Sequence, residues 1–156
     1  MFDHTITNDT DLLLLQAKAL LHSENDFIAN CSNITSLIYN NIEDLNWVGF
    51  YYLKEKELVL GPFQGLSACT RITLGKGVCG TAALEMKTLN IPNVHTFEGH
   101  IACDSASNSE CVIPLIVDNK IIGVFDIDSP LLNRFDKKLQ LFFEQIVHSL
   151  VQESTI

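Results

Sequence analysis

Hydrophobic residues recur with a helical period at both ends of the chain. A Leu-rich run over 10–23 follows a Thr-Asn-Asp-Thr cluster that can cap the start of a helix. The spacing i, i+4, i+7, i+11 predicts a second helix over 26–40, with one apolar face made of Phe27, Cys31, Ile34 and Ile38. Asp136 is expected to cap a closing helix, whose apolar stripe is Leu139, Phe143, Ile146 and Leu150. Cys31 is therefore expected to pack as a small core residue.

The middle of the chain shows the pattern of short strands. Strands are predicted at 46–53, 57–63, 111–117 and 121–128, with a brief extended piece around 89–91. The charged turn 54–56 and the Asp118-Asn119-Lys120 turn are typical of hairpins, although Pro114 weakens the strand that contains it. Helices at both ends around a run of hairpins predict an α+β fold, with an antiparallel sheet and the N- and C-terminal helices packed on one face.

Two segments between the predicted hairpins have a different character. The stretch 81–86 is expected to be a short helix after two glycines. The composition becomes polar over 95–109, which predicts a long loop. A loop of that length in a compact domain is usually functional.

Composition narrows the class of protein. The chain has 156 residues, 47% of them hydrophobic, and 10 basic against 19 acidic side chains give a net charge of −9. We expect one domain over 1–156, long enough to bury a core without disulfides or metal. The acidic balance argues against nucleic acid and anionic membrane surfaces as partners. The first residues lack a basic targeting region and no apolar run approaches the ~18 residues of a membrane span, so we expect a cytoplasmic protein.

The glycines, histidines and cysteines of the chain partly match two ligand-binding patterns, a dinucleotide-binding glycine motif and a metal site. The segment 75–80 matches G-x-G-x-x-G, but no acid follows the next predicted strand and the surroundings are hairpins rather than a βαβ unit. We therefore expect these glycines to let the backbone turn tightly into a helix and approach a neighbouring group closely. Potential metal ligands occur at His95, His100, Cys103, Cys69 and Cys79, without the paired close spacing of structural zinc sites. We expect neither a metal nor a bound cofactor.

The five cysteines differ in their surroundings. Cys103 lies in the polar loop, away from any apolar period, so its thiol is available for chemistry. Cys31 and Cys111 lie in apolar stretches and are expected to be inert. Cys69 and Cys79 lie in turn-rich segments and would meet Cys103 if the loops fold over one edge of the sheet. An odd number of cysteines in a chain with an adequate core indicates packing residues, metal ligands or redox catalysts rather than a structural disulfide framework.

Acidic and aromatic residues supply a second candidate constellation. Asp126 and Asp128 are two apart on a predicted strand, so their side chains share one face, and Glu110 on the partner strand can join them. Burial and mutual repulsion would raise at least one pKa, which suits a site that holds an ammonium group and supplies a proton. Trp47 and Tyr51 share one face of their strand and are either core residues or an aromatic wall for a methyl–sulfur group or a cation.

Several segments together resemble one enzyme family. They are NWVGFY (46–51), LGPFQG (60–65), ACTRI (68–72), GKGVCGTA (75–82), HIACDSAS (100–107) and DIDSP (126–130). They resemble the GAF-domain free methionine-(R)-sulfoxide reductases over nearly the whole chain, most strongly over 46–130. The expected fold is thus GAF-like.

The resemblance assigns roles to the candidate residues. It implies that Cys103 is the nucleophile, that Cys69 is the resolving cysteine, and that Cys79 is an auxiliary or alternative resolver. Glu110, Asp126 and Asp128 match the family's substrate-binding and acid positions, and Trp47 and Tyr51 match its pocket aromatics. The chain departs from the family at Cys111, which is expected to pack in its strand but leaves a fourth sulfur near the site.

The reaction implied is reduction of free L-methionine-(R)-sulfoxide to methionine. Attack by Cys103 would leave a sulfenic acid, which condenses with a second thiol to a disulfide that thioredoxin reopens. The substrate's ammonium and carboxylate would be paired inside the site, and the family is commonly dimeric. The alternative is a GAF domain that senses a small molecule or redox state, and a lone domain without an output module disfavours it.

Overall fold

The structure is a computed structural model, and it describes residues 9–99, 101 and 105–156. Its helices are α1 (Thr10–Leu21), α2 (Phe27–Asn41), α3 (Gly77–Glu85), the short 3-10 helix η1 (Val94–Thr96) and α4 (Lys137–Glu153). Its strands are β1 (Trp47–Lys54), β2 (Glu57–Gly65), β3 (Arg71–Thr73), β4 (Leu89–Ile91), β5 (Ser109–Val117) and β6 (Lys120–Ser129).

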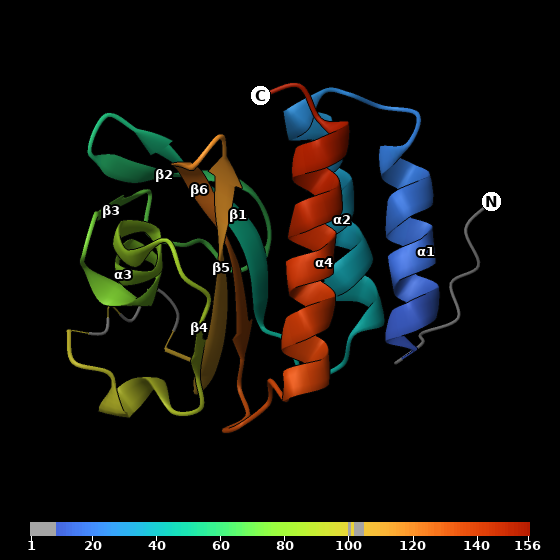
Figure 1. Cartoon of the computed structure of the whole chain (residues 1–156). Coiled ribbons are helices and arrows are strands. Elements are labelled where there is room, and N and C mark those ends of the chain that lie inside the picture. The colour runs from blue at the N-terminus through green and yellow to red at the C-terminus, as the bar shows by residue number, and fades with distance from the viewer. Residues whose placement is uncertain (1–8, 100, 102–104) are drawn as a thin grey trace.

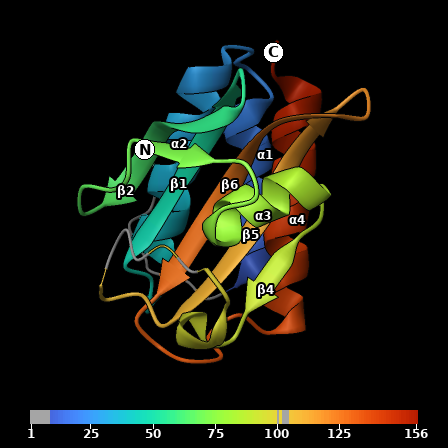
Figure 2. The ribbon, with the colours of Figure 1, turned by 90° about the vertical axis from the view of Figure 1, so that its left-hand side faces the viewer.

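The strands form one antiparallel sheet in the order β3-β2-β1-β6-β5-β4. Helices α2 and α4 cover one face, and α1 packs against both of them on the outside (Figure 1). Helix α3 covers the opposite face, in front of β5 and β6 (Figure 2). The predicted α+β fold, with the N- and C-terminal helices on one side of an antiparallel sheet, is confirmed.

Aspartates begin the three long helices. The carboxylate of Asp9 accepts hydrogen bonds from the backbone N–H groups of Asp11 and Leu12, at 3.0 and 3.2 Å. Asp26 accepts one from Ala29 at 2.8 Å. Asp136 accepts one from Leu139 at 2.7 Å, which confirms its predicted capping role. Each cap satisfies backbone donors that a helix start would otherwise leave unpaired.

The turn between β5 and β6 explains how two long strands meet closely. Asp118 and Asn119 have positive φ values of 48° and 60°, as the two central residues of a type I′ turn require. Pro114 is accommodated because β4 pairs with β5 only as far as Val112, so no β4 residue is paired opposite the proline.

Three predictions about the middle of the chain were inaccurate. Helix α3 begins at Gly77 rather than at 81, the edge strand β3 was missed, and the predicted loop 95–109 contains most of η1 and the first residue of β5. Glycine disfavours helix by propensity, yet Gly80 is required in the first turn of α3 because a Cβ there would lie 2.5 Å from the carbonyl oxygen of Thr73. Strand β3 has three residues, too few to show alternation.

The sheet separates two hydrophobic clusters. The helix-side cluster lies between the sheet and helices α1, α2 and α4, and includes Cys31, Phe50, Cys111, Phe125 and Phe143. The α3-side cluster includes Trp47, Tyr51, Cys79, Val112 and Val124. The predictions that Cys31 is a core residue and that Trp47 and Tyr51 share a face opposite to Phe50 are confirmed. Within the described residues, no helix has the length and apolarity needed to cross a membrane.

Candidate active site

A pocket opens on the α3 side of the sheet, with a volume of about 470 Å³ including its mouth. Its walls come from β1, the segment after β2, β3, the start of α3, and β5 and β6. The lining residues described are Trp47, Tyr51, Ala68, Ile72, Lys76, Gly77, Val78, Cys79, Ile101, Ser107, Glu110, Asp126 and Asp128. The pocket therefore brings together the predicted acidic and aromatic residues with one of the predicted cysteines.

Strand register places the acids beside one another. Asp128 on β6 is paired with Trp47 on β1 and with Glu110 on β5, so the three residues form one row across the sheet. Asp126, two residues earlier on β6, lies on the same face between Gly49 and Val112. Asp126 and Asp128 share a face because side chains alternate along a strand with a period of two residues. Together with the pairing of Asp128 and Glu110, this register groups the three acids as the sequence predicted.

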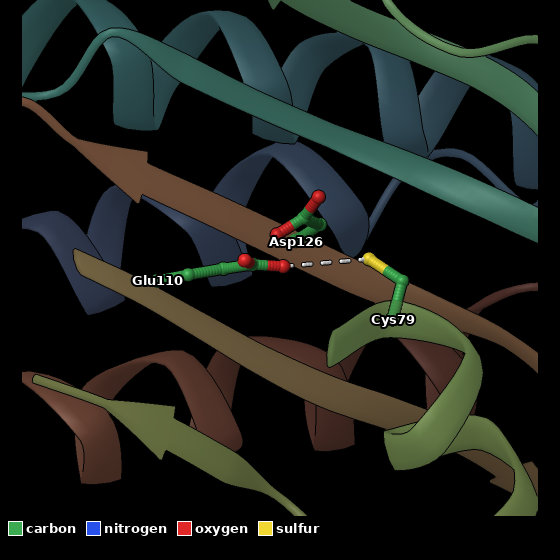
Figure 3. Close-up of side chains that lie close together, drawn as sticks. All are labelled: Cys79, Glu110 and Asp126. Atoms are coloured by element: carbon green, nitrogen blue, oxygen red, sulfur yellow. Dashed lines mark hydrogen bonds between the residues drawn. The ribbon is translucent and has the colours of Figure 1, made fainter. Parts of the chain in front are cut away.

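A thiol and two carboxyl groups lie close together in the pocket. Figure 3 shows the side chains of Cys79, Glu110 and Asp126 converging from α3, β5 and β6. The Sγ atom of Cys79 lies 3.8 Å from Oε1 of Glu110, and the three groups offer one S and two O atoms that all lie within 4.8 Å of one another. Glu110 and Asp126 are each only 6% exposed. Oδ1 of Asp126 has no hydrogen-bond partner among the described residues.

Burial shifts the protonation of these acids. It raises the pKa of Glu110 well above the usual carboxyl range, and the negative charges of Asp126 and Asp128 add to the effect. Burial also raises the pKa of Asp126, to about 6, against the opposing hydrogen bonds from Cys79 and Glu110. Near neutral pH the Glu110–Asp126 pair therefore shares one proton. The expectation that at least one of the acids has a raised pKa agrees with this arrangement.

An aromatic wall faces the acids. The indole of Trp47 stacks on Tyr51 and on Phe63, with ring centroids 5.8 and 5.4 Å apart. A Cβ at Gly49 would collide with the indole, so this glycine makes the space in which Trp47 lies across β1. The indole N–H donates to the carbonyl of Leu66 at 3.1 Å, and the Tyr51 hydroxyl donates to the carbonyl of Cys69 at 3.0 Å. These two bonds attach the segment that carries Cys69 to the pocket.

Comparison with known proteins finds one matching domain family and several similar proteins of known activity. The GAF domain family matches residues 26–153. The free methionine-R-sulfoxide reductase of Escherichia coli is 51% identical over 132 residues, which cover 85% of this chain and 80% of that protein. The fRMsr of Staphylococcus aureus in complex with substrate superposes with a TM-score of 0.89 at 47% identity, covering 96% of this chain and 98% of that one.

A second substrate complex agrees. The free methionine-R-sulfoxide reductase of Neisseria meningitidis, in complex with its substrate, superposes with a TM-score of 0.91 at 36% identity, covering 98% of this chain and 94% of that one. The chain belongs to the GAF-domain free methionine-R-sulfoxide reductases. The resemblance noted in the sequence is thereby confirmed.

The cysteines of this reductase chain occupy three different environments. Cys69 is disulfide-bonded. Cys79 is a buried free thiol in the pocket wall, and Cys31 and Cys111 are buried free thiols in the helix-side cluster. Cys103, the predicted nucleophile, lies outside the described residues, as does His100. The expectation that Cys111 leaves a fourth sulfur near the site is corrected, because alternation along β5 directs it to the opposite face from Glu110.

The histidine and cysteine metal set considered from the sequence is not assembled among the described residues. Nε2 of His95 is 2.8 Å from Oδ1 of Asn108 on the surface. The group with ligand atoms close enough for a cation is instead Cys79, Glu110 and Asp126. In the protonation state described above, this group presents one carboxylate, a carboxylic acid and a thiol, a set that also suits a substrate ammonium.

Sequence reasoning missed several lining residues of the reductase pocket. Lys76 and the backbone of Gly77 and Val78 face the pocket at the start of α3, and Ser107 accepts a hydrogen bond from the Asn46 side chain at 3.0 Å. The G-x-G-x-x-G match was the available signal for the first three. It predicts a tight turn into a helix and a close approach of the backbone to a neighbouring group, and in the structure it brings the N-terminus of α3 to the pocket.

Proposed function

We propose that this pocket reduces free L-methionine-(R)-sulfoxide to methionine, with Cys103 as the nucleophile and Cys69 as the resolving cysteine. The observation that carries the proposal is the buried Glu110–Asp126 pair, which keeps a proton near neutral pH in a pocket with an aromatic wall. A sulfoxide sulfur is attacked readily by a thiolate only when its oxygen is protonated or hydrogen-bonded. The carboxyl pair offers that proton.

The chemistry balances with the residues named. The Cys103 thiolate attacks the sulfur, the oxygen is protonated from the carboxyl pair, and methionine departs as Cys103 becomes a sulfenic acid. Condensation with the Cys69 thiol forms a disulfide and releases water, and the dithiol of thioredoxin then reduces that disulfide. Cys69 is disulfide-bonded while Cys31, Cys79 and Cys111 are free, which supports Cys69 as the redox-active cysteine among those described.

Selectivity for the free amino acid follows from charges at opposite walls. The Asp126 carboxylate on β6, whose buried Oδ1 has no hydrogen-bond partner among the described residues, suits the substrate ammonium, and Asp128 also lines the pocket. Lys76 and the backbone N–H groups at the start of α3 suit the substrate carboxylate. A methionine sulfoxide within a peptide lacks both charges and would leave the buried Asp126 carboxylate unpaired.

The aromatic wall suits the other end of the substrate. As the sulfoxide oxygen is protonated, positive character develops at the sulfur and its methyl group. The indole face of Trp47 can contact such a group by dispersion and by cation–π attraction. We therefore propose Trp47 and Tyr51 as substrate-binding residues, together with Glu110, Asp126 and Asp128.

The test measures NADPH oxidation through thioredoxin reductase and thioredoxin with three substrates: the free R sulfoxide, the free S sulfoxide and a sulfoxidised peptide. We expect turnover of the free R sulfoxide alone. Cys103→Ser should abolish it, whereas Cys69→Ser should complete one turnover and then stall. Normal turnover by Cys103→Ser, or equal rates with the peptide, would refute the assignment. Binding of the sulfoxide without any turnover by the reduced chain would favour the sensor alternative.

A further inference from the structure

Among the described residues, Cys79 is the cysteine that lies against the Glu110–Asp126 pair. It sits in the first turn of α3, its side chain is 4% exposed, and its Sγ lies 3.8 Å from Oε1 of Glu110. The same sulfur also lies within 4.8 Å of a carboxylate oxygen of Asp126. Figure 3 shows the sulfur directed at the carboxyl groups.

We propose that Cys79 is a positioning residue, whose S–H group donates a hydrogen bond to the Glu110–Asp126 pair and whose sulfur takes no part in the disulfide chemistry of turnover. This assignment rests on the proposed function of the pocket. It replaces the auxiliary resolving role that the resemblance suggested for this cysteine.

The surroundings disfavour the thiolate that a resolving cysteine must form. Burial raises the pKa of the Cys79 thiol, and the charges of Asp126 and Glu110 raise it further. The other titratable groups lining the pocket are Tyr51 on β1, Asp128 on β6 and Lys76 just before α3. Lys76, which is exposed, is the only cation among the described lining residues, whereas three carboxyl groups line the same pocket. Since the thiolate is the form that attacks, Cys79 is a poor resolver.

The helix that carries Cys79 also fixes where its sulfur lies. Gly80 packs so closely on Thr73 that a Cβ would come within 2.5 Å of the Thr73 carbonyl oxygen. The backbone N–H of Gly75 donates to the Gly80 carbonyl at 2.8 Å, and that of Gly80 donates to Lys76 at 3.0 Å. These contacts hold the first turn of α3 against the sheet. The sulfur is therefore held beside the acids.

A donor at this position has a clear use. Asp126 must carry a negative charge in a buried place, and its Oδ1 has no hydrogen-bond partner among the described residues. Hydrogen bonds from Cys79 oppose the effect of burial and lower the pKa of both Asp126 and Glu110. With the donor removed, Asp126 would ionise at a higher pH. The pocket would then lose its charge for the substrate ammonium while still near neutrality.

The experiment compares Cys79→Ser, which keeps a donor, with Cys79→Ala, which does not. In Cys79→Ala the acidic limb of the kcat/KM profile should move up by about 0.5 pH unit or more, as expected for loss of a weak bond to a charged group. Cys79→Ser should restore the wild-type limb. Both variants should be reduced by thioredoxin after the first turnover at a rate within about twofold of wild type. A full first turnover followed by stalled recycling in both variants would overturn the proposal.

Two measurements keep this test separate from the proposed function. Carbon-13 NMR titration of the Asp126 carboxyl, without substrate, should show a higher pKa in Cys79→Ala than in wild type and Cys79→Ser. Peptide mapping after oxidation with hydrogen peroxide should find Cys79 as a free thiol. Equal Asp126 titration in all three proteins, or a disulfide at Cys79, would overturn the positioning role. Failure of the wild type to reduce the free sulfoxide would refute the proposed function. The NMR titration and the peptide mapping would still decide whether Cys79 donates a hydrogen bond to the acids, because neither measurement depends on turnover.

Discussion

Glu110 and Cys111 are neighbours in the chain and lie in opposite chemical environments. Glu110 faces the pocket with Asp126 and Asp128, whereas Cys111 packs in the helix-side cluster. Both side chains are buried. One β-strand therefore contributes to a reactive surface and to an inert core at adjacent positions, and the sheet keeps the two apart.

The two faces also differ in what burial does to stability. On the helix side the buried groups are mostly apolar, and Phe125 packs against Phe50 and Phe143 with ring centroids 4.5 and 6.1 Å apart. On the α3 side burial includes two acids whose pKa values are raised, and each raised value records a free-energy cost of ionisation in the fold. The helix side supplies stability, and the pocket side gives up some of it for reactivity.

The largest expected effect tests the helix side. Phe143→Ala removes a fully buried ring and should lower the free energy of unfolding by about 3–5 kcal/mol, measured by urea denaturation. The protein that remains folded should keep its kcat/KM for the free sulfoxide, because the ring lies on the far side of the sheet from the pocket. A tenfold loss of kcat/KM in fully folded protein would show that the faces are not independent.

The next effect has the opposite sign and tests the pocket side. The pKa of Asp126 is raised from 3.8 to about 6, so the folded protein holds this proton more tightly than the unfolded chain. Stability from this group is complete below the unfolded pKa and is lost as the pH rises through about 6. An asparagine side chain cannot ionise, so Asp126→Asn avoids this pH-dependent loss of stability. The variant should raise the free energy of unfolding by about 3 kcal/mol at pH 8 but only about 1 kcal/mol at pH 4.5.

The same variant should be a poorer enzyme. Asp126→Asn cannot pair with the substrate ammonium or exchange a proton with Glu110, so we expect kcat/KM to fall by about 100-fold or more. Chemical denaturation at both pH values and the coupled NADPH assay check the two halves. A variant that lost stability at pH 8 would contradict the account of a costly buried charge, and one with undiminished kcat/KM would contradict the role in the reaction.

These two faces were not equally predictable from the sequence. Period and capping chemistry are local, so α4 with its Asp136 cap and the stripe that includes Phe143 were predicted closely. The pairing of Asp126 with Asp128 on one face followed from strand alternation. The proximity of Cys79 to Glu110 and Asp126 did not, because it depends on how α3 packs on the sheet, and the first turn of α3 is glycine-rich and weak in helix signal.

The position of Cys111 shows where family likeness is less informative than geometry. Its place directly after Glu110 suggested a sulfur near the site. Strand alternation alone, applied to that pair, would have put it on the opposite face. The protonation of the acids was predictable only in part, since its extent depends on the burial that the whole fold creates.

A smaller effect should follow from the helix-side neighbour of Glu110. Cys111→Ser places a hydroxyl group in the apolar cluster and should lower the free energy of unfolding by about 1–3 kcal/mol. Cys111→Val, which stays apolar, is the matched control and should change it by less than about 1.5 kcal/mol. Thioredoxin-dependent turnover should persist in both, and loss of recycling would place this sulfur in the redox cycle.

The smallest expected effect contrasts two aspartates. Asp136 is exposed and its carboxylate caps α4 through the N–H of Leu139, so Asp136→Ala should lower the free energy of unfolding by about 1 kcal/mol. Asp136→Asn, which keeps an accepting oxygen, should recover most of that loss. At pH 8 the loss of a carboxylate thus weakens the fold at Asp136 and strengthens it at Asp126. Urea denaturation of the three variants at pH 8 measures these changes in the free energy of unfolding. An increase of that free energy in Asp136→Ala would show that exposure and hydrogen bonding do not explain why the two carboxylates affect stability differently.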